Sequence, residues 1–67
     1  MTHALNQEIA RKCFASLVLD YEYEGDKVHG FEPFASGRVL IDGWYRADIS
    51  ASNREELIAK FENTSWS

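Results

Sequence analysis

With 67 residues, of which 45% are hydrophobic, the chain can form one small domain but not two. Eleven acidic residues against seven basic ones give a net charge of −4 and an isoelectric point near 4.9. This balance argues against binding of nucleic acid or of an anionic membrane surface through positive charge. The hydrophobic share argues against a disordered chain. We therefore expect a single folded domain over residues 1–67.

The first predicted element is a short helix over residues 2–14. Its apolar side chains recur at spacings of four, one, three and one: Leu5, Ile9, Ala10, Cys13 and Phe14. This spacing places them on one helical face. Arg11 and Lys12 would lie in the last turn, where the helix dipole favours positive charge.

A first strand is predicted over residues 15–24, where apolar and polar side chains alternate. One face carries Ala15, Leu17, Leu19, Tyr21 and Tyr23. The other carries Ser16, Val18, Asp20, Glu22 and Glu24. Since strand side chains alternate between faces, we expect the first set, both tyrosines included, to face the core. The residues that follow, 25–27, are typical of a turn.

Residues 28–37 have the least regular pattern. Residues 28–31 are compatible with a second strand that pairs back on the first. Pro33 has no N–H to donate to a central ladder, so its surroundings are predicted as a sheet edge or a loop. Residues 35–37 are predicted as a turn.

The longest alternating stretch is residues 38–49, and it allows two interpretations. As one strand, it places Val39, Ile41, Gly43, Tyr45, Ala47 and Ile49 on one apolar face. The alternative is a hairpin at Asp42–Gly43, because Asp-Gly between apolar runs is a strong turn signal. In that hairpin Val39 would face Arg46, which mixes the faces. We therefore expect one continuous strand that accommodates a bulge at Gly43.

A second helix is predicted to begin near Asn53. Ser52 and Glu55 have the spacing of a capping box. The predicted buried stripe is Leu57, Ile58 and Phe61, and Asn63 is the predicted end. Trp66 either folds back on the core or stays exposed. The expected fold is α+β in the order helix–strand–strand–strand–helix, with both helices on one face of a three-stranded antiparallel sheet.

Four acidic residues at alternate positions form the first candidate site: Asp20, Glu22, Glu24 and Asp26. On one strand face they would project roughly 6.6 Å apart, which is twice the rise per residue. This spacing is comparable to that of successive phosphates, so the row could occupy a basic groove that normally holds nucleic acid. The alternative is a solvated face on which the acids pair with Arg38 and Arg46 of the neighbouring strand.

Exposed aromatic side chains form the second candidate site. Phe31, Phe34 and Trp44 could anchor a protein interface, or Phe31 and Phe34 could close the small core instead. They could also stack single-stranded bases, but that would need cationic surroundings, whereas Glu32 and Asp42 lie nearby in sequence.

The chain shows no catalytic set. The grouping of Asp26, His29 and Glu32 has no second His or Cys, so we expect no metal site. The four glycines are scattered and form no phosphate-binding loop. We therefore expect no enzymatic activity and no cofactor.

The single cysteine excludes an internal disulfide and fits a reducing compartment. No apolar run is long enough to cross a bilayer, and the N-terminus lacks the features of a signal peptide. We expect a cytoplasmic protein that does not bind membranes.

In its small size, its acidity and its α+β pattern, the chain resembles the small inhibitor proteins of phages and mobile elements, anti-CRISPR proteins among them. The resemblance implies a protein that blocks a larger partner. The leading hypothesis is thus a non-enzymatic module that binds a larger, basic, nucleic-acid-handling protein. The alternatives are a structural or regulatory homodimer, and direct binding of single-stranded nucleic acid through sheet aromatics.

Overall fold

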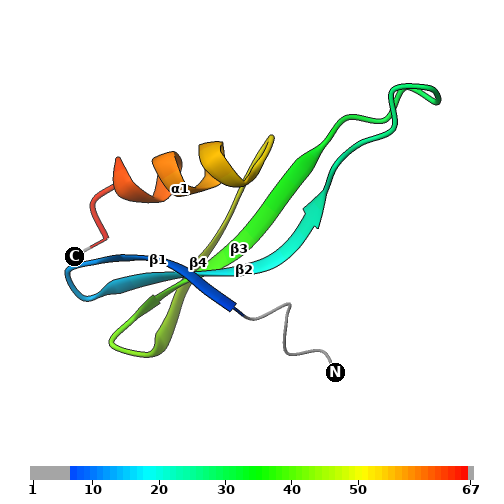
Figure 1. Cartoon of the computed structure of the whole chain (residues 1–67). Helices are drawn as coiled ribbons and strands as arrows, with labels where there is room; N and C mark the ends of the chain where they lie inside the picture. Colours follow the sequence, from blue (N-terminus) through cyan, green and yellow to red (C-terminus); the bar gives the residue numbers. More distant parts are fainter. Residues whose placement is uncertain (1–6, 67) are drawn as a thin grey trace.

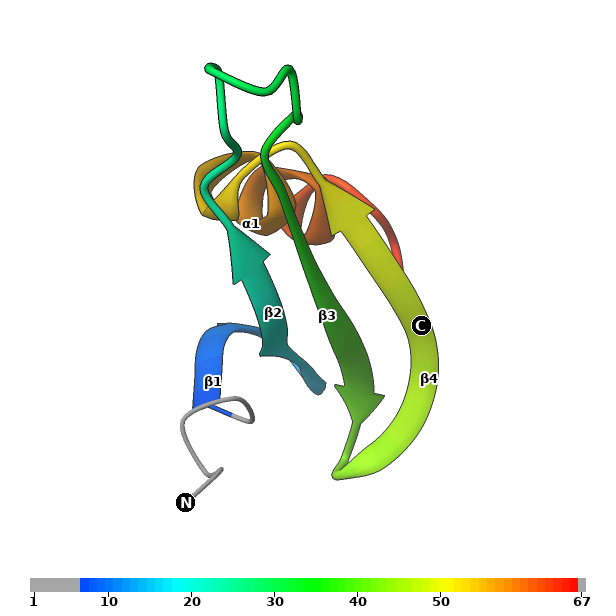
Figure 2. The same ribbon diagram turned by 90° about the vertical axis from the view of Figure 1, so that its right-hand side faces the viewer.

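The computed structural model describes residues 7–66 as a four-stranded antiparallel sheet with one helix (Figure 1). The elements are β1 (Gln7–Lys12), β2 (Ala15–Tyr23), β3 (Phe34–Ile41), β4 (Trp44–Ala51) and α1 (Arg54–Glu62). The strands lie side by side in chain order (Figure 2). The predicted fold, a three-stranded sheet with two helices, is therefore wrong in both its strand and its helix content.

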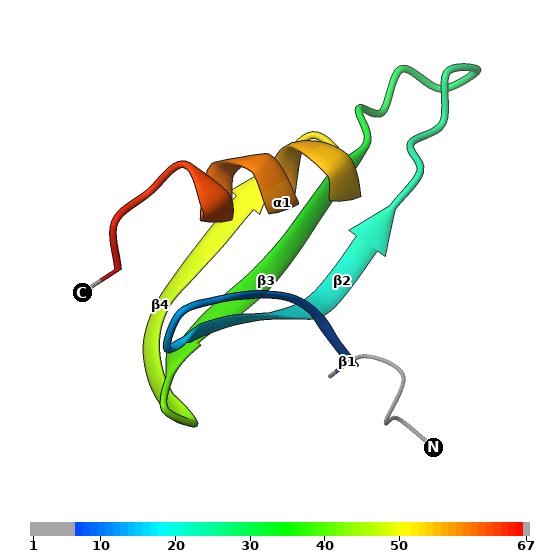
Figure 3. The ribbon, with the colours of Figure 1, turned by 60° about the vertical axis from the view of Figure 1, so that its left-hand side comes forward.

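The core lies between α1 and one face of the sheet, across which the helix runs (Figure 3). The four largest fully buried side chains come from β2, β3 and α1: Leu17, Val39, Leu57 and Phe61. On β3 this helix face is marked by Ala35, Gly37 and Val39. The opposite face, which we call the outer face, carries Phe34, Ser36, Arg38 and Leu40 of the same strand.

β1 replaces the helix predicted over residues 2–14, of which residues 2–6 lie outside the described residues. Glu8 faces Val18 and Ala10 faces Leu17, so Ile9 is an extra residue, a β-bulge. Ile9 and Ala10 both pack against the core. The bulge puts consecutive apolar residues on the core side, and this is the spacing that resembles a helix. Cys13 and Phe14, the last two residues of the predicted helix, form the tight turn between β1 and β2, with Cys13 at φ 54°.

A hairpin joins β3 and β4 at Asp42–Gly43, so the prediction of one continuous strand is wrong. Both turn residues have positive φ, 52° and 85°, as a two-residue hairpin turn of this sequence requires. Val39 nevertheless faces Ala47, because Arg46 is an extra residue in β4. This second bulge keeps Ala47, Ile49 and Ala51 on the helix face, opposite Val39, Gly37 and Ala35. It removes the mixing of faces that argued against the hairpin.

Residues 24–33, which we call the arm, project beyond the sheet between β2 and β3 (Figure 1). The strand predicted at 28–31 is wrong, since only Phe31 pairs, in an isolated bridge with Asp26. Each of these two residues donates its N–H to the carbonyl of the other at 2.9 Å. The turn predicted at 35–37 is also wrong, because β3 already begins at Phe34.

α1 agrees with the sequence except at its first turn. Its N-cap is Asn53 rather than Ser52, and the Asn53 side chain accepts a hydrogen bond from the N–H of Glu56 at 2.8 Å. Leu57 and Phe61 are fully buried, which confirms the predicted stripe, and Asn63 is the C-cap as predicted.

The C-terminal end of α1 is fastened by β1 and by the tail. Lys12 Nζ donates to the carbonyl oxygens of Glu62 at 2.6 Å and Thr64 at 3.2 Å. Trp66 folds back, stacks on Phe61 with ring centroids 6.3 Å apart, and donates from Nε1 to the Phe61 carbonyl at 2.9 Å. A cation and a ring thus satisfy carbonyl groups that a helix end leaves without partners.

Candidate functional site

A third bulge, at Asp20, changes which side chains of β2 face the core. Leu19 faces Gly37 and Tyr21 faces Ser36, so Asp20 is the extra residue. Before the bulge, odd-numbered residues lie on the helix face. After it, Glu22 faces buried Ala35, while Tyr21 and Tyr23 lie on the outer face. The prediction that both tyrosines face the core is therefore wrong.

The same bulge divides the predicted acidic row. Asp20 lies on the outer face. Each of its two carboxylate oxygens accepts a hydrogen bond from Arg38 Nε at 2.9 Å. Glu22, on the helix side, accepts from Arg54 Nη2 at 3.0 Å. The two acids therefore do not project from one face, and the predicted spacing along a single face is wrong. Both are instead paired within the protein: Arg38 binds Asp20, as the solvated-face alternative expects, but the partner of Glu22 is Arg54 of α1 and not Arg46.

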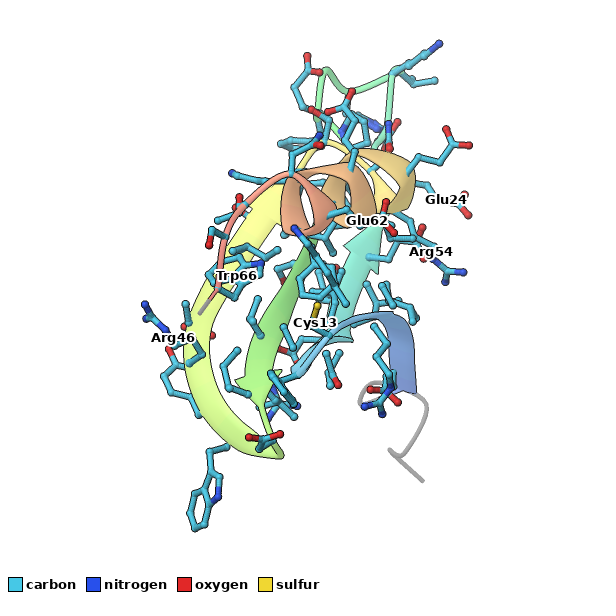
Figure 4. All side chains as sticks on the ribbon, turned by 90° about the vertical axis from the view of Figure 1, so that its left-hand side faces the viewer. Cys13, Glu24, Arg46, Arg54, Glu62 and Trp66 are labelled. Carbon is cyan, nitrogen blue, oxygen red and sulfur yellow. The ribbon has the colours of Figure 1, made fainter. Side chains whose placement is uncertain are left out.

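The other two acids of the predicted row lie in the arm. Asp26 is half-buried, with Oδ2 2.6 Å from Nδ1 of His29. Glu24 is exposed and points into solvent beyond β2 (Figure 4). Within residues 7–66 its carboxylate has no hydrogen bond or ion pair. Glu24 is therefore the acid of the predicted row whose charge remains available to a partner.

Three aromatic rings gather on the outer face beside the arm, and we call them the outer aromatic cluster: Tyr21, Tyr23 and Phe34. The Phe34 ring centroid lies 5.4 Å from that of Tyr21 and 6.2 Å from that of Tyr23. Tyr21 is 48% exposed and Phe34 is 43% exposed, although the rings contact one another. Phe31, at the end of the arm's bridge, is also exposed. Clustered exposed rings of this kind are typical anchors of protein interfaces.

Trp44 is exposed as well, but it lies at the opposite end of β3 from Phe31 and Phe34. The structure therefore separates the three predicted anchors into two groups. Beside Trp44 lie two exposed rings that the sequence pattern did not indicate, Phe14 and Tyr45. The sequence pattern places both on core faces, because the turns and bulges that expose them are not visible in the alternation. The two turns are joined by the Asp42 N–H, which donates to the Phe14 carbonyl at 3.0 Å.

Charged side chains on the outer face are largely paired with one another. Arg38 lies between Asp20, which it binds, and Asp48, which faces it across the strands. Tyr45 shares a hydrogen bond with Asp48, which together with burial and the negative charge of Asp48 raises the pKa of its phenol above the ordinary 10.0. Glu8 and Arg11 form a further ion pair at 2.8 Å.

The described residues limit the chemistry of this surface. Among residues 7–66, no three His, Cys, Asp or Glu side chains are grouped so as to hold a metal ion. In the same part of the chain, no helix has the length and apolar character needed to cross a bilayer.

Comparison of the chain with protein-family models, with curated proteins and with solved structures finds no match in any of the three.

Proposed function

We propose that the protein is a non-enzymatic binding module that attaches to a larger, basic protein through the outer aromatic cluster. One observation carries the proposal. Tyr21 and Phe34 contact each other at 5.4 Å on a sheet face that α1 does not cover, and almost half of each side chain stays exposed. Burying such rings against a partner removes apolar area from water at little cost in side-chain entropy.

The acids around the cluster indicate the charge of the partner. Glu24 and Glu32 are exposed in the arm beside Phe31, and the whole chain carries a net charge of −4. A basic surface would meet complementary charge here, which speeds association and makes it sensitive to salt. A nucleic-acid strand would meet like charge, so the same residues argue against direct base stacking on Tyr21 or Phe34.

The proposed mechanism is occupation of the partner's surface. Where the partner handles nucleic acid, Glu24 and Glu32 would take the place of phosphates and the bound module would block access. Asp20 and Glu22 add to the negative charge of the protein, but their carboxylates are already paired with arginines. We place the protein in the cytoplasm, where the exposed thiol of Cys13 stays reduced.

For the homodimer alternative, pairing between the edge strands of two copies is unfavourable. Each edge strand carries a bulge, at Ile9 in β1 and at Arg46 in β4, and bulged edges pair poorly with a further strand. Figure 4 shows Arg46 pointing away from β4 into solvent. Lys60 Nζ also donates to the edge carbonyl of Ser50 at 2.9 Å. Light scattering at micromolar concentration separates the two functions: a monomer supports a heterologous partner, and a dimer contradicts the proposal.

The experiment is affinity capture from a nuclease-treated lysate of the source cell, followed by mass spectrometry. The baits are wild type, Tyr21→Ser and a control, Trp44→Ser, which removes an exposed ring from the helix side of the sheet, where Trp44 faces Ile41. Circular dichroism confirms that each bait is folded. The proposal predicts one basic protein retained by wild type and the control and lost with Tyr21→Ser. Equal recovery by all three baits contradicts it.

A further inference from the structure

The outer face holds a second feature, a groove of about 430 Å³ at the end of the sheet opposite the arm. Its floor is Val18 and Ser16 of β2, which are only 7% and 8% exposed although no helix covers them. Its walls come from the strands on either side: Glu8 and Arg11 of β1, Leu40 of β3 and Asp42 of the β3–β4 turn. Val18 and Ser16 are therefore shielded from solvent by the charged and apolar side chains on either side of them.

Two of the charged side chains around the groove are paired with each other, and one is not. Glu8 and Arg11 neutralise each other at 2.8 Å. Asp42 is exposed, and within residues 7–66 its carboxylate has no partner, although its N–H is held by Phe14. The groove thus combines apolar side chains, Val18 and Leu40, with one unneutralised carboxylate at its rim.

We propose that this groove receives a long cationic side chain, lysine or arginine, of the basic partner. The aliphatic stem of this side chain would lie on Val18 and Leu40, and its charged head would reach Asp42. Lysine and arginine commonly bury their stems against apolar surface while the charged head stays in polar surroundings. The inference rests on the proposed function and extends it. The groove and the outer aromatic cluster lie on the same face of β2 and β3, so one bound protein covers both.

Asp42→Asn isolates the charge of Asp42. Asn tolerates the positive φ of 52° at this position, and Asn-Gly is a favoured sequence for a two-residue hairpin turn. The turn therefore stays intact while the negative charge is lost. The matched control is Glu55→Gln, which removes one exposed acid from α1 and leaves the outer face unchanged.

The test is an NMR titration of the ¹⁵N-labelled protein at low salt with three short peptides, which need no knowledge of the partner. They are identical except for a central lysine, arginine or norleucine. The proposal predicts that the lysine or the arginine peptide shifts the amide signals of Val18, Leu40 and Gly43. It also predicts binding about threefold weaker to Asp42→Asn and unchanged to Glu55→Gln, as expected for one exposed ion pair.

Three results would overturn the inference. They are the absence of shifts at Val18 and Leu40, equal binding by the norleucine peptide, and equal loss of affinity in both variants, which would indicate attraction to net charge alone. None of them bears on Tyr21 or Phe34, so the outer aromatic cluster is tested separately by the capture and crosslinking experiments.

Discussion

Arg54, the first residue of α1, donates from Nη2 to Oε1 of Glu22 in β2 at 3.0 Å, and this ion pair joins the helix to the sheet beside the arm. Asp20, two residues earlier, is bound by Arg38 on the opposite face. The bulge at Asp20 sends the two carboxylates to different sides of the sheet. Charge changes at Glu22 therefore act on the fold, whereas changes at Glu24 act on the free surface.

Glu22→Lys should lower the free energy of unfolding by about 0.5–1 kcal/mol, because it replaces an ion pair with two like charges. The small value reflects solvent screening, since the side chains of Arg54 and Glu22 are 49% and 37% exposed. Glu24→Lys, whose carboxylate has no partner within residues 7–66, should leave stability unchanged. Urea denaturation of both variants measures the difference, and equal stabilities would contradict the role given to Arg54.

Gly37→Ala should destabilise the protein by about 2–3 kcal/mol, because a new methyl group would crowd a packed interior. A Cβ at Gly37 would lie 2.5 Å from the carbonyl oxygen of Val18, which is backbone and cannot rotate away. The neighbouring Ser36→Ala, on the outer face, should change stability by less than about 0.5 kcal/mol. Urea denaturation is the measurement, and a stable Gly37→Ala protein would mean that β2 and β3 are farther apart than described.

Lys12→Met should loosen the C-terminal end of α1. The substitution keeps an aliphatic side chain but removes the ammonium group that donates to Glu62 and Thr64, at a cost of about 1 kcal/mol or less. Trp66, which stacks on Phe61, should become more accessible to acrylamide quenching of tryptophan fluorescence. The control Lys27→Met lies in the exposed arm and should leave quenching as in wild type. Equal quenching in all three proteins would contradict the proposed cap.

Glu8 should give part of the acid dependence of stability. The hydrogen bond from Ser16, then the hydrogen bond and charge of Arg11, hold the pKa of Glu8 below its ordinary 4.5. Because the folded-state pKa is the lower one, the ionised carboxylate contributes fully above pH 4.5, and this contribution is lost as the pH falls through the folded-state pKa. An NMR titration of the Glu8 carboxyl carbon should show the pKa rising towards 4.5 in Ser16→Ala. An unchanged pKa would exclude Ser16 as the main cause.

The sequence was sufficient where the periodicity is unbroken and insufficient where a strand carries an extra residue. β2 up to Leu19, and the buried stripe and C-cap of α1, follow directly from spacing. Bulges at Ile9, Asp20 and Arg46 each shift the alternation by one residue. No single residue type indicates these bulges, because the position of a bulge depends on how the strand pairs with its neighbour. That pairing cannot be read from the sequence of one strand alone.

The same bulges explain the candidate site. Phe34 was predicted as an anchor from its sequence neighbourhood, and it is exposed. Tyr21 was missed because its odd position matched Leu17 and Leu19, and only the extra residue at Asp20 turns it outward. The acidic pattern was visible in the sequence, but the arginines that neutralise two of its members come from β3 and α1, which the alternation of β2 cannot indicate.

The most direct test of the central claim is photo-crosslinking in the source cell with p-benzoylphenylalanine at position 21, compared with the same probe at position 44. Both positions hold exposed rings, Tyr21 on the outer face of β2 and Trp44 on the helix side of β4, where it faces Ile41. Binding through the outer aromatic cluster predicts a discrete adduct with a larger protein from position 21 and a much weaker one from position 44. An adduct from position 44 alone, or one with a second copy of this chain, would contradict the account.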